Sequence, residues 1–363
     1  MRPISDYPAR LPDARRLIDE GECVASVLLA ILFAHQIGAA NVSWAAFSGY
    51  MVMRGHVAES LVRGVLRIIG TAVGALIGLL VTPLVASNGW LVGLALSLIG
   101  GSTLYGALTG RRAYAWLFVG LTFVMILLDK MEHPATSLWS FAATRMLEVV
   151  AGTVACVLVS TVSTLTLRRH WPAKRSPAAA GIGWHPHAAR HAAQAASALA
   201  ILPSLGAVFH VPALAQSAVT IIAVMLVPVS SIGASGFAPV SRRLIQRVIG
   251  CLAGAALAAF FLFMAHGWPP MLIAGTMLGV AAGRHLENGQ GKLGYAGTQF
   301  VLAILVTLVP DSYSDVDLGP ALDRLMGILI GMALLEPVLF LWHVFTPAEL
   351  PASGGADHEA GGV

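Results

Sequence analysis

Apolar residues occur in twelve runs along the chain, and short polar or basic connections separate them. Long parts of these runs carry no charge, as at residues 24–34, 70–80 and 149–166. A transmembrane helix needs about 20 mainly apolar residues, so the short second, eighth and tenth runs must borrow flanking residues or be buried among neighbours. The pattern predicts an all-α, polytopic membrane protein with about 12 transmembrane helices. The runs are residues 23–40, 42–53, 65–83, 89–109, 113–128, 138–167, 195–211, 214–230, 244–265, 268–282, 293–309 and 324–345.

The composition leads to the same class of protein. Hydrophobic residues make up 57% of the 363 residues and charged residues only 11%, whereas a soluble domain has roughly 25% charged residues. The mean hydropathy is +0.78. The net charge of +4 comes from basic residues spread between the apolar runs and not from one basic face. The lipid bilayer is therefore the expected partner, and nucleic acid is not.

The connections between the runs predict the orientation of the chain. If the runs alternate in direction, the basic connections fall on one side of the membrane: residues 54–67, 110–112, 168–190, 241–247 and 283–292. The other side receives one connection without Lys or Arg, one mixed and one acidic: residues 83–89, 129–133 and 311–317. Because Lys and Arg are retained on the cytoplasmic side, we expect a multi-pass protein with both termini in the cytoplasm.

An internal repeat is visible when the chain is compared with itself. Residues 67–74, RIIGTAVG, recur 180 residues later at 247–254 as RVIGCLAG. Residues 145–152, RMLEVVAG, likewise match 324–331, RLMGILIG, at an offset of 179. The glycines of these segments are expected to let helices approach closely in lipid. The order is kept, so we expect two direct six-helix repeats, related by an axis along the membrane normal, with a pathway or site between them.

These boundaries divide the chain into five parts. Acidic residues near the N-terminus argue against a signal peptide, so the first apolar run is read as a retained helix. The linker between the repeats, rich in Pro, Ala, His and basic residues, is expected to have little fold of its own. The parts are residues 1–22 (cytoplasmic N-terminal segment), 23–168 (first membrane repeat), 169–192 (cytoplasmic linker), 193–346 (second membrane repeat) and 347–363 (disordered cytoplasmic tail).

Four arginines at matching positions of the two repeats are the candidate substrate-binding residues. Arg67 and Arg247 lie at the cytoplasmic ends of their helices, where snorkelling to lipid phosphate is the alternative role. Arg145 and Arg324 enter their helices from the other side, where the positive-inside rule disfavours arginine. The guanidinium fork suits a carboxylate substrate.

A structural ion pair is the alternative for the second pair of arginines. Glu148 lies one helical turn from Arg145 and can pair with it, and Asp323 can do the same beside Arg324. Such a pair would hold the arginine in place without any substrate. The sequence leaves both readings open.

Four residues are candidates for coupling to protons. Glu336 lies about midway along the last run, directly before Pro337, where a buried acid can carry a proton or bond the backbone freed by the proline. Glu148 is a second candidate acid. His35 and His210 are expected near the outer ends of their helices, where interfacial hydrogen bonding competes with a role in proton relay.

The sequence contains no constellation that predicts an enzyme or a cofactor site. A phosphate-cradling glycine loop with lysine, a His-Glu-x-x-His motif and a nucleophile elbow are all missing. Cys23, Cys156 and Cys251 are far apart and show neither disulfide nor metal spacing. Without a nucleotide site, uphill work would have to draw on ion or proton gradients.

At these residues the chain resembles the fusaric acid resistance family of aromatic acid exporters. The motifs are Arg-x-x-Gly-Thr-x-x-Gly from Arg67, its repeat at Arg247, the helix opening at Arg145, and Trp44 after a short outer connection. The similarity covers most of residues 20–345. It implies efflux of aromatic or other organic carboxylic acids across a bacterial inner (plasma) membrane. More distantly, the family is similar to plant malate channels, whose membrane units are also helical and arginine-lined.

One departure from the family concerns partners. Larger members insert a substantial cytosolic domain, whereas the linker here spans only residues 169–192. This short linker counts against assembly with a periplasmic adaptor. Small organic anions remain the expected partners, and homo-oligomerisation is left open.

Three hypotheses about function follow. The leading one is a proton-coupled exporter of organic carboxylic acids, and its rival is a passive organic-anion channel. A third is a membrane scaffold that transports nothing. Arginines in both repeats favour an anion pathway over a scaffold, and the acid at Glu336 favours coupling over a channel.

Overall fold

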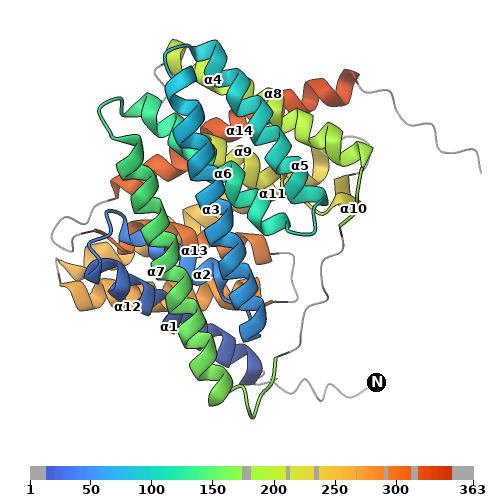
Figure 1. Ribbon diagram of the computed structural model, residues 1–363. Coiled ribbons are helices and arrows are strands. Elements are labelled where there is room, and N and C mark those ends of the chain that lie inside the picture. The colour runs from blue at the N-terminus through green and yellow to red at the C-terminus, as the bar shows by residue number, and fades with distance from the viewer. Residues whose placement is uncertain are drawn as a thin grey trace, which may run out of the picture.

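The computed structural model describes residues 14–173, 181–209, 213–232, 237–266, 268–289, 293–311 and 318–345. These residues form helices and short connections, without a strand in the described part (Figure 1). The first half contains α1 (Ala14–Gln36), α2 (Val42–Val52), α3 (Val57–Val85), α4 (Gly89–Ala95), the π-helix η1 (Leu96–Gly100), α5 (Gly101–Thr109), α6 (Ala113–Glu132) and α7 (Leu138–Leu165). The second half contains α8 (Pro186–Phe209), α9 (Leu214–Met225), α10 (Val229–Ile232), α11 (Phe237–Ala265), α12 (Pro269–Glu287), α13 (Gly294–Leu308) and α14 (Gly319–Phe345).

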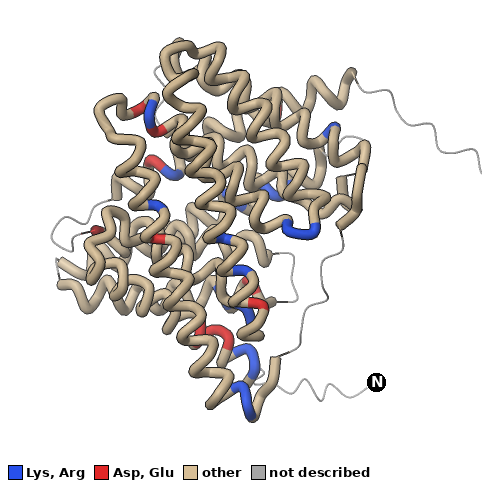
Figure 2. Tube along the Cα trace, viewed as in Figure 1, with Lys and Arg blue, Asp and Glu red and all other residues tan. Residues whose placement is uncertain are grey.

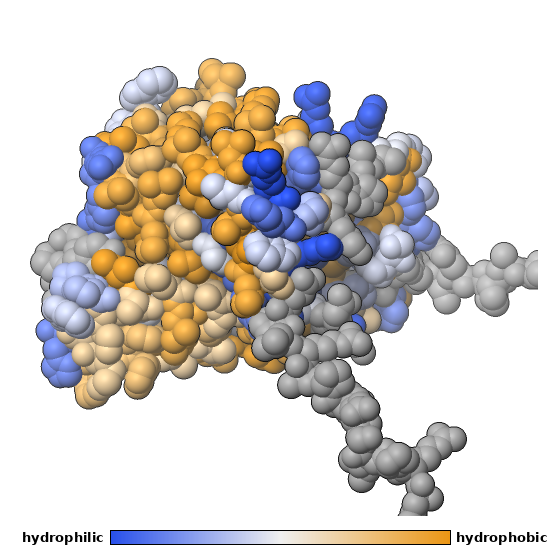
Figure 3. Space-filling view, turned by 90° about the horizontal axis from the view of Figure 1, so that it is seen from below, coloured by the Kyte–Doolittle hydropathy of each residue, from blue (hydrophilic) through white to orange (hydrophobic). Residues whose placement is uncertain are grey.

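The prediction of a polytopic all-α membrane protein is confirmed. Seven helical stretches among the described residues are long and apolar enough to cross a membrane: α3, the continuous stretch α4–η1–α5, α6, α7, α8, α11 and α14. Large apolar side chains such as Leu84 and Phe263 are 74% and 71% exposed, which fits a surface solvated by lipid. Figure 3 shows a broad apolar surface with hydrophilic residues near its centre and along its edges. The count of about 12 crossings stays a prediction.

Glycines allow the long helices of each half to pack closely. Helix α3 lies along α6, and α11 lies along α13. A Cβ atom added at Gly74 would lie 2.9 Å from the Cβ of Thr122, and one added at Gly254 would lie 2.9 Å from the Cβ of Ala303. Any side chain at these positions would push the two helices apart, so the packing role expected of the glycines is confirmed.

Helices of the first half pack against helices of the second half at their interface. Helix α1 of the first half packs against α12 of the second, and α8 of the second half packs against α4 and α5 of the first. In addition, α6 contacts α9 and α2 contacts α13. The interface is therefore extensive, and residues of both halves surround the centre of the molecule.

Several helices begin earlier than the apolar pattern predicted. Helix α3 begins at Val57 and not at residue 65, and α11 begins at Phe237 and not at residue 244. The His56 side chain accepts a hydrogen bond from the Ala58 backbone N–H and caps α3. Helix α8 begins at Pro186, so the end of the predicted linker is helical. Backbone hydrogen bonding continues through polar residues, which is why hydropathy alone placed these starts too late.

A buried ionic network joins the first half to the second. The carboxylate of Asp19 accepts two hydrogen bonds from Arg284, at 2.7 and 3.1 Å. The carboxylate of Glu22 accepts two from Arg168, at 2.9 and 2.7 Å. Figure 2 shows acidic and basic residues side by side where α1 meets the end of α7. Asp19 and Glu22, two of the acids near the N-terminus, thus hold α1 to its neighbours.

Replacing Glu22 by Gln is expected to lower the stability of the folded protein. The Glu22 and Arg168 side chains are only 4% and 6% exposed, and loss of one member of a buried pair costs about 3–5 kcal/mol. Thermal unfolding in detergent should show a lower midpoint. Glu20→Gln is the matched control, because the Arg16 and His285 partners of Glu20 are 28% and 51% exposed. Equal midpoints for the two variants would contradict the role given to the buried pair.

Candidate functional site

A cavity of ≈ 860 Å³ lies between the two halves. Its walls carry eight arginines and a single acidic residue, Glu287, among the described residues. The arginines are Arg54, Arg63, Arg67, Arg145, Arg243, Arg247, Arg284 and Arg324. Burial and the nearby charge of Arg63 lower the pKa of Arg54 to about 10. Because arginines outnumber acids in this lining, the cavity carries a surplus of positive charge within an apolar bundle, and this charge attracts anions.

In the first half, Arg67 projects from α3 into the cavity. This arginine is 1% exposed, and its Nη1 donates to the hydroxyl of Tyr114 on α6 at 3.3 Å. Its guanidinium lies 4.1 Å from the ring centroid of Phe118 and 4.9 Å from that of Phe47. The guanidinium of Arg63 lies 4.0 Å from the ring centroid of Tyr114. Aromatic faces therefore hold these two cations in place.

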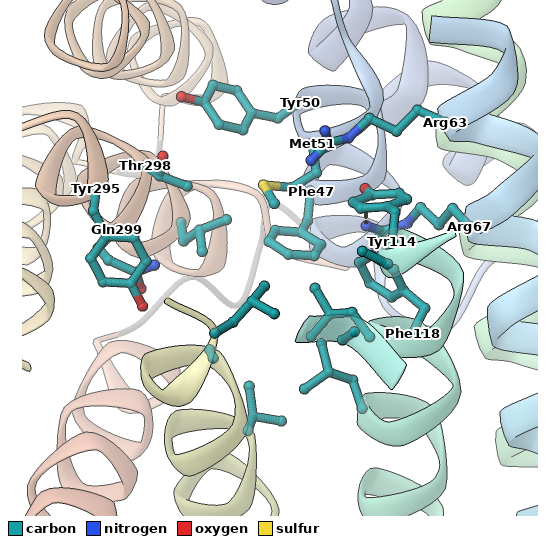
Figure 4. A pocket seen from close by; sticks show the side chains of 18 of the residues that line it. Phe47, Tyr50, Met51, Arg63, Arg67, Tyr114, Phe118, Tyr295, Thr298 and Gln299 are labelled. Atoms are coloured by element: carbon teal, nitrogen blue, oxygen red, sulfur yellow. Dashed lines mark hydrogen bonds between the residues drawn. The ribbon is translucent and has the colours of Figure 1, made fainter. Parts of the chain in front are cut away.

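The second half repeats this arrangement with α11 and α13. Arg247 is 2% exposed, and its Nη1 donates to the hydroxyl of Tyr295 at 3.3 Å and to Oε1 of Gln299 at 2.9 Å. The guanidinium of Arg243 lies 4.3 Å from the ring centroid of Tyr295. Figure 4 shows Tyr295 and Gln299 on one side of the cavity and Arg67, Tyr114 and Phe118 on the other. The same cation and phenol pair thus lines both sides.

The two arginines of the last helices have different partners. Arg145 on α7 forms an ion pair with Glu148 at 3.1 Å, and its guanidinium lies 4.3 Å from the ring centroid of Trp44. Arg324 on α14 donates to Oε1 of Gln299 at 3.3 Å. The suggested partner of Arg324, Asp323, is exposed, whereas the side-chain partner that the structure gives Arg324 is Gln299. Neighbouring residues on a helix point in different directions, so that suggestion was wrong.

Several buried arginine nitrogens in this cavity have no hydrogen-bond partner among the described residues. They are Nε of Arg63, Arg67, Arg243, Arg247 and Arg324, and Nη2 of Arg247. A buried donor without a partner is rare, because its desolvation is not compensated. These nitrogens surround a space large enough for a small molecule, so an anionic ligand can satisfy them.

A second cavity of ≈ 1130 Å³ adjoins the first. Both cavities share Ser43, Trp44, Val306 and Arg324 as lining residues. The second one has acids on its walls: Glu132, Asp311 and Asp323. Trp44 and Arg324 therefore lie where a mainly basic cavity and a cavity with an acidic lining meet.

Two of these acids hold the halves together in a reciprocal way. Asp311 of the second half accepts the backbone N–H of Val42, the first residue of α2, at 2.7 Å. Glu132 of the first half accepts the backbone N–H of Leu214, the first residue of α9, at 2.6 Å. A carboxylate is favourable at a helix N-terminus because the first N–H groups have no partner inside the helix. Each half therefore caps a short helix of the other.

The structure brings the four predicted substrate-binding arginines into one cavity. Arg67, Arg145, Arg247 and Arg324 all line it. The burial of Arg67 and Arg247 excludes the alternative in which they snorkel to lipid phosphate, because snorkelling needs an exposed head group.

The candidate proton-coupling residues are scattered. Glu148 is fully buried and contacts Arg145 and the backbone N–H of Asn41 at 3.1 Å. Glu336 is half-buried on α14 and does not line either cavity. His35 is exposed in the last turn of α1. His210 lies outside the described residues.

Sequence reasoning missed half of the arginines and most of their partners. The missed lining residues include Arg54, Arg63, Arg243, Arg284, Tyr114, Tyr295 and Gln299. Extending the internal repeat beyond its glycine segments would have found some of them, since Arg63 recurs at Arg243 with the same offset of 180 residues. The cross-half contacts carry no such signal.

Two family models match this chain. The Fusaric acid resistance protein family matches residues 23–180, and the Fusaric acid resistance protein-like family matches residues 231–335. No curated protein and no solved structure matches the chain. The two matches fall on the two halves that share the arginine-lined cavity, and the chain belongs to the fusaric acid resistance protein family.

Proposed function

We propose that this protein transports aromatic and other organic carboxylic acids across a bacterial inner membrane, and that the arginine-lined cavity is its binding site. The observation that carries this proposal is the lining itself, where the described residues include eight arginines and one acid. A carboxylate can bind a guanidinium fork through both of its oxygens, and it is attracted strongly in a medium of low dielectric constant. Fusaric acid, which the family name mentions, is itself an aromatic carboxylic acid.

Aromatic side chains support the choice of aromatic substrates. Rings line the cavity beside the arginines: Trp44, Phe47, Tyr50, Tyr114, Phe118, Phe141 and Tyr295. Planar substrates can stack on such rings while a neighbouring guanidinium binds their carboxylate. A scaffold that transports nothing would have no need for buried, unpartnered guanidinium groups.

Export is the proposed direction of transport. A membrane potential that is negative inside favours outward movement of an anion that crosses without a proton, by roughly 2.3 kcal/mol per charge for each 100 mV. The acidic lining of the second cavity, with Asp311 and Asp323, would repel an anion that has passed Arg324 and so lower its affinity there. The anion therefore leaves the second cavity more easily than it enters it again.

The proposed architecture is two direct six-helix repeats with twelve crossings. Its support is the matching contacts of the halves, such as Arg67 with Tyr114 and Arg247 with Tyr295, both at 3.3 Å. The two halves also match in how they meet. Each half caps a short helix of the other, and the first helix of each half, α1 or α8, packs against the other half. Two parallel repeats place a transport site at their interface.

Glu148 is the acid best placed to couple transport to protons. The carboxylate of Glu148 lies 3.1 Å from the guanidinium of Arg145. An anion that approaches Arg145 therefore competes with Glu148 for this guanidinium. A carboxylate displaced from its ion pair inside an apolar bundle takes up a proton, and it releases that proton when the pair forms again. Glu336, half-buried and away from both cavities, is the second candidate.

Flux measurements on reconstituted vesicles test this function. We expect labelled benzoate, salicylate and fusaric acid to cross vesicle membranes that contain the protein, faster than protein-free membranes allow, while organic cations do not. Accumulation driven by an imposed pH gradient would indicate a coupled transporter. Flux that only follows the anion's own gradient would indicate the passive channel. Absence of flux for every acid in the panel would overturn the proposal and favour a scaffold.

A further inference from the structure

The two halves build the cavity from matching arginines but give them different neighbours. In the first half, the guanidinium of Arg67 lies over the ring of Phe118. Gln299 takes the place of Phe118 in the second half. A Cβ atom added at Gly70 would lie 3.0 Å from the Cβ of Phe118, and one added at Gly250 would lie 2.9 Å from the Cβ of Gln299. An apolar ring on one side of the cavity is thus replaced by an amide on the other.

Arg145 and Arg324, which lie on the last helix of each half, also have different neighbours. Arg145 has its positive charge balanced by Glu148, three residues further along α7. The corresponding residue after Arg324 is Gly327. A Cβ atom added at Gly327 would overlap the Cβ of Gln216, so packing against α9 leaves no room there for an acidic side chain. Arg324 therefore lacks the intrahelical acid that pairs with Arg145 in the first half.

Gln299 connects the two arginines of the second half. Its Oε1 accepts from Arg247 at 2.9 Å and from Arg324 at 3.3 Å, and the two arginines are 2% and 7% exposed. A neutral amide oxygen cannot offset two buried positive charges. Moreover, Nε and Nη2 of Arg247 and Nε of Arg324 have no partner among the described residues.

Glu287, the one acid among the described residues that line this cavity, does not compensate the site. Glu287 lies 3.3 Å from Arg284 and accepts a hydrogen bond from the Tyr50 hydroxyl at 2.6 Å. Its charge is thus committed to the network that joins α1 and α12. Three buried donors around Gln299 remain for a ligand.

We propose that Arg247, Gln299 and Arg324 form the carboxylate seat of the cavity, and that Phe118 and Phe47 opposite them receive the apolar or aromatic body of the ligand. A carboxylate has two oxygens, which can accept from Nε and Nη2 of Arg247 as a fork and from Nε of Arg324. The ligand class is a monocarboxylate with a planar, apolar body. The claim that this ligand is transported rests on the proposed function, whereas the claim that it binds here does not.

Gln299→Glu tests the seat, because it places a tethered carboxylate between the two arginines. Titration calorimetry of the purified full-length protein in detergent would use benzoate as the probe and benzamide as its neutral counterpart. We expect the affinity for benzoate to fall at least about tenfold, since the tethered group competes for the same charged hydrogen bonds. Gln246→Glu is the matched control. It makes the same change of charge on α11 at a half-buried residue outside the cavity lining, and it should bind benzoate as the wild type does.

Arg324→Gln is the second variant, and it keeps the test decisive if Gln299→Glu does not fold. It removes one of the two cations and should also weaken benzoate binding about tenfold or more. A single elution peak and an unchanged unfolding temperature identify folded variants. Unaltered benzoate binding by both folded variants, or a wild type that binds no benzoate, would overturn the carboxylate seat. Benzoate that binds as expected but is never transported would leave the seat standing and reject the proposed function.

Discussion

Arg247→Gln is expected to reduce benzoate flux through reconstituted vesicles to less than roughly a tenth of the wild-type rate. The guanidinium of Arg247 is 2% exposed, and two of its nitrogens have no partner among the described residues. A neutral amide in its place removes both the charge and the fork, and each charged hydrogen bond contributes about 1.5–3 kcal/mol. Stopped-flow or labelled-benzoate uptake measures this loss.

Two further variants make this result specific. Arg247→Lys keeps the charge but loses the fork, so we expect only partial recovery of flux. Arg112→Gln, at an exposed residue outside the cavity, makes the same change of charge and should leave flux unchanged. Wild-type flux in a folded Arg247→Gln variant would mean that the anion takes a route other than this cavity.

Glu148→Gln is expected to remove the dependence of transport on a pH gradient while substrate exchange continues. Gln can still accept the Asn41 N–H that Glu148 accepts now, at 3.1 Å, so the start of α2 should stay in place. It cannot balance the charge of Arg145 or exchange a proton. Benzoate accumulation in vesicles with an imposed pH gradient of either sign measures coupling, and the sign that works tells whether the proton moves with or against the anion.

Glu336→Gln serves as the comparison for the coupling experiment. The structure leaves Glu336 half-buried and outside both cavities, so its replacement should leave gradient-driven accumulation unchanged. The opposite pattern, with coupling lost in Glu336→Gln and kept in Glu148→Gln, would move the proton path to α14 and reject the role of Glu148.

The sequence alone predicted the class of the protein and the centre of its site. Hydropathy is enough for the class, because a lipid-solvated helix needs a long uncharged run, and helices occur at each of the twelve runs. The internal repeat singled out Arg67, Arg145, Arg247 and Arg324, and all four line one cavity. A buried arginine is costly in lipid, so its recurrence in both repeats is informative.

Other arginines were misread because they lie at the ends of apolar runs. Arg63 and Arg243 were counted as charges of cytoplasmic connections, yet they lie within α3 and α11 and line the cavity. Arg284 was counted in the same way, and it binds Asp19 across 265 residues of chain. Hydropathy cannot distinguish a basic loop from a polar helix end that faces a cavity, and long-range ion pairs have no local signature.

Acidic residues were the least predictable part of the site. Glu336 was considered as a buried acid because it lies about midway along the last apolar run, but it is only half-buried, whereas Glu148 is fully buried. Depth along a helix does not determine which face points inward, and that face follows from packing against neighbouring helices. The caps supplied by Asp311 and Glu132 likewise depend on how the two halves meet.

An experimental structure of the protein with 4-bromobenzoate bound would test the central claim most directly, because anomalous scattering locates the bromine and the density locates the carboxylate. Our account predicts one molecule in the ≈ 860 Å³ cavity, with its carboxylate at Arg247 and Arg324 and its ring beside Phe118. A ligand bound elsewhere, while this cavity holds only lipid or remains closed by its own side chains, would contradict it.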